Sequence, residues 1–281
     1  MKKIEAELLK ASRPGPDYFL HTYFAPELSK ASEPGQFVEI RVGDGPHPIL
    51  RRPFSISFAQ GETIQVLFKV VGEGTRLLSM KKKGTLIDII GPIGTPFEIE
   101  EKPAVLVAGG IGCAPLYFLA ARLREAGREV AFLYGARAKN DLVLLQEIAG
   151  VADELKTTTE DGSLGTKGLI TDLLLPFLIP DYAIYACGPE SMLIALQKML
   201  AERRLEAQFS LENYMACGVG ACQGCSIETT RGFRRVCVDG PVFSSGEIVS
   251  FPFSPRLKQD VCGESRTRAP IVNQTDRGIN P

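Results

Sequence analysis

Four cysteines near the C-terminal end of the chain have the spacing of metal ligands. They follow the pattern C-x4-C-x2-C-x11-C and are Cys217, Cys222, Cys225 and Cys237. The glycines between them can adopt positive φ and bring backbone amides close to sulfur, which stabilises thiolate charge. A C-x4-C-x2-C run with a later fourth cysteine is the plant-type ligand pattern of a [2Fe–2S] cluster, although the fourth cysteine comes sooner here. The spacing therefore predicts an iron–sulfur centre.

Other uses of these cysteines fit the surrounding sequence less well. A structural zinc site usually has paired C-x2-C knuckles or histidine ligands, whereas the stretch 212–243 has one C-x2-C and no histidine. Disulfides suit a small secreted domain, but the N-terminal MKKIEAELLK lacks the apolar core of an export signal. We therefore expect a protein of the reducing cytoplasm whose cysteines bind metal.

The composition is that of a globular protein without a strong charge preference. The 281 residues are 44% apolar and 23% charged, with a formal net charge of −1. No overall field favours nucleic acid and no apolar run is long enough to cross a membrane, so we expect neither as a partner. We predict an α+β multidomain protein with domains at 1–100, 101–209 and 210–250, and a flexible tail at 251–281.

The first hundred residues are predicted to form a small antiparallel β-barrel. Short apolar runs separated by glycine and proline turns are typical of its strands. These runs are Phe37–Val42, Ile56–Phe58, Ile64–Val71 and Leu86–Ile90.

Two stretches of the predicted barrel have residues that could bind a cofactor. In Arg51–Ile56, a planar cation, an aromatic ring and a hydroxyl can hold a phosphate, cover a ring and hydrogen-bond a heteroatom. The same residues could also simply begin a strand. In Gly72–Thr75, glycine and a hydroxyl precede a helical pattern, which makes either an anion site at a helix N-terminus or an ordinary helix cap.

The central region begins with a strand, a glycine turn and a helix. Ala104–Ala108 is an apolar strand, Gly109–Gly112 is the turn, and the helix is expected at Leu116–Ala126. This order is how proteins bind dinucleotide phosphates, although the motif GGxGxAP is not the usual GxGxxG.

Further strands of the central region also end in glycine turns. Val130–Tyr134 is followed by Gly135, and Asp181–Ala186 is followed by Cys187-Gly188-Pro189. Helices are expected near 141–149, 169–175 and 190–204. The alternation predicts an open parallel sheet with a ligand at the C-terminal ends of its strands.

Three cysteines lie outside the cluster pattern. Cys187 stands at such a strand end, where it either faces a ligand or fills a buried space. Cys113 is expected to be a buried thiol, and Cys262 is expected to be a free thiol in the polar tail.

The ordered set of motifs resembles the ferredoxin-NADP reductase superfamily. The motifs are RPFS, GEGT, GPIG, GGIGCAP and CGPESM. With ENYMACGVGACQGC and RRVCVDGPVF added, the chain resembles the electron transfer subunits of dihydroorotate dehydrogenase B, over residues 3 to 243. The cysteine module is the most specific part of this resemblance, because many flavin reductases share the glycine turns.

The resemblance implies a role for each motif. FAD would be bound by Arg52, Pro53, Phe54, Ser55, Gly74 and Thr75. NAD would be bound by Gly109, Gly110, Gly112, Pro115, Cys187, Gly188 and Pro189, with Cys187 as the candidate nearest the nicotinamide. The four cysteines of the C-terminal pattern would bind [2Fe–2S].

The implied activity is electron transfer between NAD(H) and a partner chain. FAD would take hydride from NADH, or deliver it to NAD⁺, because a flavin can handle one or two electrons while a [2Fe–2S] cluster handles one. The partner would be the FMN-containing catalytic subunit, which oxidises dihydroorotate in pyrimidine biosynthesis, and a heterotetramer is implied. Two alternatives stay open: a reductase subunit with a ferredoxin-, sulfite- or hydrogenase-linked acceptor, and a metal-stabilised adaptor without redox activity.

Overall fold

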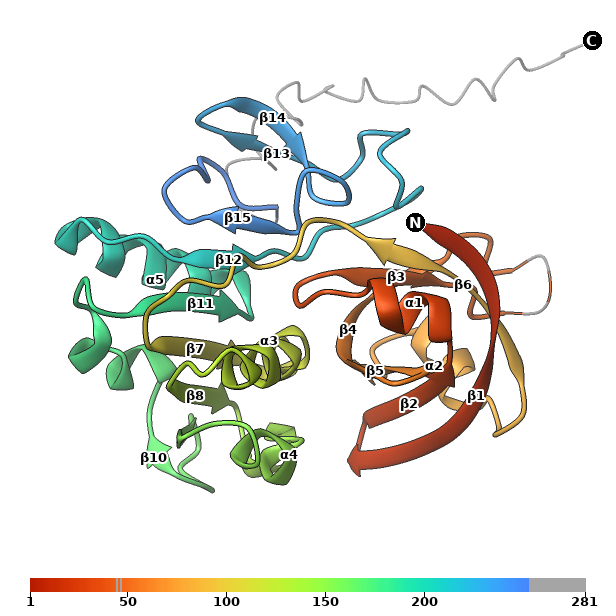
Figure 1. Cartoon of the computed structure of the whole chain (residues 1–281), viewed down its shortest axis with the longest axis horizontal. Coiled ribbons are helices and arrows are strands. Elements are labelled where there is room, and N and C mark those ends of the chain that lie inside the picture. The colour runs from red at the N-terminus through yellow and green to blue at the C-terminus, as the bar shows by residue number, and fades with distance from the viewer. Residues whose placement is uncertain (44, 46, 253–281) are drawn as a thin grey trace, which may run out of the picture.

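The chain folds into a barrel, an α/β domain and a small C-terminal module (Figure 1). The computed structural model describes residues 1–43, 45 and 47–252. The closed barrel comes first, and the domain with a largely parallel sheet follows. This architecture confirms the predicted α+β multidomain fold class. The part of the predicted tail from residue 253 onward, including Cys262, lies outside the described residues.

Six antiparallel strands close the barrel in the order β1-β2-β5-β4-β3-β6. They are β1 (Lys2–Gly15), β2 (Tyr18–Phe24), β3 (Phe37–Ile40), β4 (Arg52–Gln60), β5 (Thr63–Lys69) and β6 (Leu86–Ile93). Residues such as Val38 and Ile40 on β3 and Ile64 and Val66 on β5 alternate along their strands and form the apolar core. The short helices α1 (Pro26–Ala31) and α2 (Glu73–Ser79) lie in the connections.

The barrel strands differ in extent from the predicted runs. β4 begins at Arg52, so the RPFS motif begins the strand, as one of its two sequence interpretations expected, and the apolar run Ile56–Phe58 lies inside β4. β1 is 14 residues long but only Ala6 and Leu8 are buried, so it has no apolar run that the sequence could reveal. Pairing with both β2 and β6, together with the fully buried Ala6 and Leu8, keeps this strand in place.

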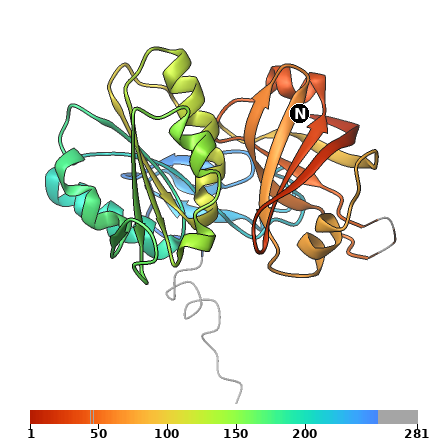
Figure 2. The same ribbon diagram turned by 90° about the horizontal axis from the view of Figure 1, so that it is seen from below.

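The α/β domain contains a seven-stranded sheet in the order β10-β9-β8-β7-β11-β12-β15. Its strands are β7 (Ala104–Gly109), β8 (Val130–Ala136), β9 (Glu154–Thr159), β10 (Thr166–Lys167), β11 (Ala183–Cys187), β12 (Gln208–Ser210) and β15 (Val242–Ser244). Helix α3 (Cys113–Glu125) lies between this sheet and the barrel (Figures 1 and 2). The rings of Phe58 on β4 and Tyr117 on α3 stack with centroids 5.0 Å apart, which joins the two domains.

The helices of this domain are shorter than predicted at two places. The predicted helix at 141–149 reduces to α4 (Leu145–Ala149), because Leu144 has φ 59° and the N–H of Val143 donates to the Tyr134 hydroxyl. The predicted helix at 169–175 consists of two 3-10 turns, Ile170–Leu173 and Leu175–Phe177. The expected helix near 190–204 is α5 (Glu190–Arg203).

The C-terminal module combines a two-stranded hairpin with a long loop. The hairpin strands are β13 (Ser226–Thr229) and β14 (Gly232–Arg235). The last strand of the module, β15, is antiparallel to β12 and so completes the sheet of the α/β domain. The N–H of Thr95, which follows β6, donates to the carbonyl of Gly240 at 2.6 Å. The module is therefore attached to both preceding domains.

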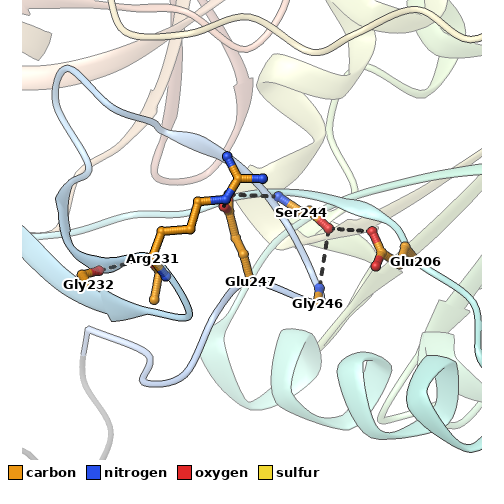
Figure 3. A network of polar contacts seen from close by, with 7 residues as sticks. Glu206, Arg231, Gly232, Ser244, Gly246 and Glu247 are labelled. Carbon is orange, nitrogen blue, oxygen red and sulfur yellow. Dashed lines mark hydrogen bonds and ion pairs between the residues drawn. The ribbon is translucent and has the colours of Figure 1, made fainter.

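A polar network also ties the hairpin to the α/β domain (Figure 3). The Ser244 hydroxyl donates to Glu206 at 2.8 Å, and the N–H of Ser244 donates to Glu247 at 3.3 Å. Arg231 at the hairpin turn forms a long ion pair of 3.9 Å with Glu247. Because Glu206 precedes β12, this network joins the module to the sheet at its edge. Among the described residues, no helix is long and apolar enough to cross a membrane.

Candidate functional site

A cavity of about 580 Å³ lies at the C-terminal ends of the parallel strands. The glycine turns after β7, β8 and β11 all reach it, and the barrel supplies another part of its wall. Its lining includes Gly109, Gly110, Gly135, Gly188 and Pro189 from the α/β domain and Tyr18 and Lys69 from the barrel. The position is the one where open parallel sheets bind ligands. The cavity is large enough for part of a dinucleotide.

Three residues of the predicted NAD site lie outside the lining. Gly112, Pro115 and Cys187 are buried behind it. A Cβ on Gly112 would lie 2.1 Å from the carbonyl oxygen of Cys187, so only glycine allows the start of α3 to pack on β11. Gly112 therefore shapes the cavity without lining it. Burial raises the pKa of the Cys187 thiol well above its ordinary value, so the group stays protonated.

Glu212 is a cavity residue that the sequence did not single out. It follows β12 and lines the cavity, and it is also exposed to solvent. Desolvation by the surrounding atoms raises the pKa of Glu212, and the Glu212 carboxylate in turn contributes to the raised pKa of Cys187. Nothing local in the sequence marks Glu212, because β11 and β12 bring it to this place.

A polar cluster at the domain boundary was also missed. Asp141 of the α/β domain accepts a hydrogen bond from Tyr18 on β2 at 2.9 Å and one from Lys69 on β5 at 2.7 Å. All three residues line the cavity, as do Arg137 and Glu160. Because each comes from a separate segment, no local sequence motif contains the cluster.

The two predicted FAD-binding stretches lie next to each other. A Cβ on Gly74 would lie 3.0 Å from the Nε of Arg52, so the guanidinium covers the start of α2. Phe54 packs beside Phe68 with ring centroids 5.6 Å apart. Thr75 accepts hydrogen bonds from the N–H groups of Val71 and Gly72, at 3.0 and 3.2 Å, and so caps the helix.

Arg51 and Arg52 have different partners. Arg51 forms a 2.6 Å ion pair with Asp88 on β6, which fixes it to the barrel. Arg52 donates to the backbone carbonyls of Leu50 and Arg51, and no carboxylate among the described residues pairs with it. Its position over the start of α2 suits a phosphate group.

The four cysteines of the C-terminal module approach each other as two pairs. The N–H of Cys222 donates to the sulfur of Cys217 at 3.4 Å, and the thiols of Cys225 and Cys237 interact with each other. Among the residues that the structure describes, no group of three or more side chains gathers around one point as ligands of a single metal ion. A [2Fe–2S] cluster needs two thiolates on each iron, because two sulfides bridge the irons. The two-and-two arrangement fits that donor set.

Backbone amides around the cluster loop favour thiolate. Burial alone would raise the pKa of Cys217, but hydrogen bonds from the N–H groups of Cys222 and its neighbours outweigh it and lower that pKa to about 6. Gly218 and Gly220 have φ of 64° and 81°, which lets the loop curl around the sulfur atoms. Arg235 holds the loop by donating to the carbonyl of Gly220 at 3.0 Å.

Glu39 lies beneath this loop. It is 2% exposed, and both carboxylate oxygens lack a hydrogen-bond partner among the described residues. A Cβ on Gly218 would lie 2.4 Å from its Oε1, so the loop packs directly on the Glu39 side chain. In the barrel sheet, Glu39 on β3 is the backbone partner of Pro53 on the neighbouring strand β4. Burial raises the pKa of Glu39 to about 7, against the opposing effect of Arg51. The candidate FAD strand and the cluster loop are thus separated by one strand.

Family models match two parts of the chain. Residues 106–198 match the oxidoreductase NAD-binding domain. Residues 212–249 match the iron-sulfur cluster binding domain of dihydroorotate dehydrogenase B.

Full-length relatives decide the family. A protein of Bacillus cereus (strain Q1), described as the electron transfer subunit of dihydroorotate dehydrogenase B (NAD(+)), is 39% identical over 79% of this chain and 89% of its own length. The counterpart in strain G9842 is 40% identical over the same shares. The chain belongs to this family. Membership confirms the resemblance seen in the sequence and supports an NAD-linked oxidoreductase subunit with FAD, [2Fe–2S] and NAD(H) as cofactors.

Solved structures agree with the fold. The NADH-dependent reduced ferredoxin-NADP oxidoreductase, studied for flavin-based electron bifurcation, aligns with a TM-score of 0.78 at 33% identity, over 87% of this chain and 90% of its own. The ferredoxin reductase of carbazole 1,9a-dioxygenase aligns with a TM-score of 0.63 at 24% identity, over 73% of this chain and 66% of its own, which shows the fold alone.

Proposed function

We propose that this subunit exchanges hydride with NAD(H) at FAD and relays single electrons through a [2Fe–2S] cluster. The other end of the relay is the FMN-containing catalytic subunit, which oxidises dihydroorotate in pyrimidine biosynthesis. The family of the chain and the two matched domains support this relay. A flavin is needed between the other two groups because it can hold one or two electrons.

One observation carries the proposal: the barrel contacts both the dinucleotide cavity and the cluster loop. Lys69 and Tyr18 of the barrel line the cavity, while Glu39 on the neighbouring part of the barrel supports the loop at Gly218. β4, with the RPFS motif, lies in the barrel sheet between β5, which carries Lys69, and β3, which carries Glu39. A flavin bound along β4 would therefore stand between the nicotinamide and the cluster.

Specific residues are proposed for each cofactor. FAD would be held by Arg52 at its phosphates, by Phe54 and Ser55 beside the ring, and by the start of α2 at Gly74 and Thr75. The dinucleotide would lie against the turns at Gly109, Gly110 and Gly188. The four cysteines of the C-terminal pattern would bind the cluster.

The module exposes a face suited to the catalytic subunit. Cys222 is exposed, so the cluster would reach the surface at this point. Large apolar side chains are also exposed on the module, with 80% of Tyr214, 75% of Phe233 and 38% of Val219 accessible. Exposed apolar surface beside a redox centre favours a docking face for another protein. A heterotetramer with two copies of each chain would follow if the catalytic subunit is itself a dimer.

The proposal is tested on the subunit purified without air. NADH should bleach the flavin and then the cluster absorbance, while dihydroorotate should cause no change until the catalytic subunit is added. Cys225→Ser should remove the iron–sulfur spectrum and leave FAD bound. Turnover of dihydroorotate by the isolated subunit, or a normal cluster spectrum in the variant, would contradict the proposal.

A second acceptor deserves a test because of the bifurcating reductase among the similar structures. Its 33% identity over 87% of this chain makes ferredoxin an alternative acceptor. Co-purification of the native complex separates the two functions, since the companion chain is either an FMN-containing dehydrogenase or another flavoprotein. A Val219→Lys variant should weaken the recovery of either companion if the docking face is correct.

A further inference from the structure

Inside the cavity, the ammonium group of Lys69 forms an ion pair with the carboxylate of Asp141. The Nζ of Lys69 lies 2.7 Å from Oδ1 of Asp141, and the Tyr18 hydroxyl donates to the same oxygen at 2.9 Å. The ammonium group also lies 4.9 Å from the centroid of the Tyr18 ring. Lys69 and Tyr18 come from the barrel, whereas Asp141 comes from the α/β domain. The cluster therefore spans the domain boundary inside the proposed dinucleotide site.

Both charges of the pair are partly accessible. The side chain of Lys69 is 36% exposed and that of Asp141 is 25% exposed. Partial burial raises the pKa of Asp141, but hydrogen bonds from Lys69 and Tyr18 outweigh it and leave the pKa below its ordinary value. Asp141 is thus a carboxylate at neutral pH, and it faces the same space as the turn at Gly109 and Gly110.

A dinucleotide would bring a pyrophosphate with two negative charges into this space. Backbone amides of a glycine turn bind such a group well, and an ammonium group binds it further. Asp141 has the opposite effect, because it holds the ammonium group that would neutralise the pyrophosphate. After Lys69 has moved to the pyrophosphate, Asp141 would still have a cation nearby, because Arg137 also lines the cavity and lowers the pKa of Asp141.

We propose that Asp141 sets the affinity for the dinucleotide by competing with its pyrophosphate for Lys69. This inference rests on the proposed use of the cavity by NAD(H). The Lys69–Asp141 pair bridges the two domains, and a bound pyrophosphate would take Lys69 away from Asp141. Tyr18 assists Asp141, because its hydroxyl holds the carboxylate in place. Asp141 acts on the dinucleotide through Lys69, so it is a positioning residue.

A double-mutant cycle on the oxidised, FAD-loaded subunit tests the inference by calorimetry. The ligands are ADP-ribose, which contains the pyrophosphate, and adenosine, which does not. Asp141→Asn should lower the Kd for ADP-ribose about fivefold, since couplings between neighbouring sites are commonly of this size. Lys69→Met should raise that Kd about tenfold, as expected for the loss of a charge-assisted contact. Adenosine affinity should stay the same in both variants.

The decisive measurement is Asp141→Asn in the Lys69→Met background. Competition for Lys69 predicts that the effect of Asp141→Asn disappears there, because no ammonium group is left to release. If Asp141→Asn still lowers the Kd for ADP-ribose about fivefold in that background, Asp141 acts by direct repulsion of the pyrophosphate and not through Lys69. If Asp141→Asn alone weakens ADP-ribose binding, Asp141 favours the bound ligand. Either result overturns the inference.

Two controls complete the design. Glu125→Gln removes a carboxylate from the exposed end of α3, away from the cavity, and should leave both affinities unchanged. Tyr18→Phe should act in the same direction as Asp141→Asn but more weakly. If wild-type subunit neither binds ADP-ribose nor is reduced by NADH, the proposed function fails. If wild-type subunit does both and the cycle is additive, only the role of Asp141 fails.

Discussion

The dinucleotide cavity and the cluster loop are held in place by different means. The cavity is lined by turns at the ends of buried parallel strands, so its backbone is positioned by the core of the α/β domain. The cluster loop between Cys217 and Cys225 contains no strand or helix. It relies on positive φ at Gly218 and Gly220, on Arg235, and on the buried side chain of Glu39 beneath it.

This difference predicts how each site should respond to an amino-acid substitution. A change in the cavity backbone must disturb the core behind it, because the turns and the strands are one packed unit. A change in the cluster loop can stay local, because few elements depend on it. Four predictions, from the largest expected effect to the smallest, test this contrast.

Gly112→Ala should have the largest effect. Its Cβ would lie 2.1 Å from the backbone oxygen of Cys187, and neither α3 nor β11 can move without opening the core. We expect a loss of more than about 4 kcal/mol in the free energy of unfolding, or no folded protein, as for other severe clashes in a core. Gly110→Ala is the control, since no atom lies within 4 Å and only its φ of 52° opposes alanine. The control should cost about 1 kcal/mol in urea denaturation. Equal costs for both would contradict the rigid packing.

Acid should destabilise the barrel through His21. This side chain is fully buried in the barrel core, and burial lowers its pKa from 6.5 to about 4. Between these values the unfolded chain binds more protons at His21, so the stability that His21 contributes is complete above about pH 6.5 and is lost as the pH drops toward 4. The loss is as much as about 3 kcal/mol. In this pH window, the free energy of unfolding of His21→Gln should change less with pH than that of the wild-type protein. An unaltered pH dependence would rule out His21 as the cause.

Gly218→Ala should damage the cluster loop and leave the two domains intact. The new Cβ would meet Glu39 at 2.4 Å, in a backbone conformation with φ 64° that alanine rarely adopts. We expect a local cost of about 2 kcal/mol and a reduced iron content with normal FAD binding. Gly224→Ala is the matched control, because its nearest atom is the sulfur of Cys222 at 3.6 Å. Loss of FAD together with iron in Gly218→Ala would show that the loop is not an independent unit.

The network of Figure 3 should contribute least. Ser244→Ala removes the hydrogen bond to Glu206 and should cost about 1 kcal/mol, with faster proteolysis at the edge of the module. Arg231→Met removes a 3.9 Å ion pair from a side chain that is 73% exposed, and should cost less than about 0.5 kcal/mol. A larger effect for Arg231→Met than for Ser244→Ala would reverse this ranking.

Residues close together in the chain were largely predictable. The cysteine spacing, the glycine turns after β7, β8 and β11 and the apolar run of β7 are all local patterns, and the fold class followed from them. Strand and helix limits were less predictable, because pairing with β2 and β6 sets the extent of β1, and a hydrogen bond to Tyr134 accompanies the shorter α4. Glu212, Lys69 and Asp141 went unnoticed because each is an ordinary residue in its own segment.

The sequence alone determined which chemistry the chain can perform, since cysteine ligands and glycine turns depend on residue type and short spacing. The tertiary structure decided which groups meet. Packing of the barrel on the α/β domain brought Lys69 to Asp141, and packing of the C-terminal module brought Gly218 onto Glu39. The physical reason is that contacts between distant segments arise from the burial of whole surfaces, to which each residue contributes only a small part.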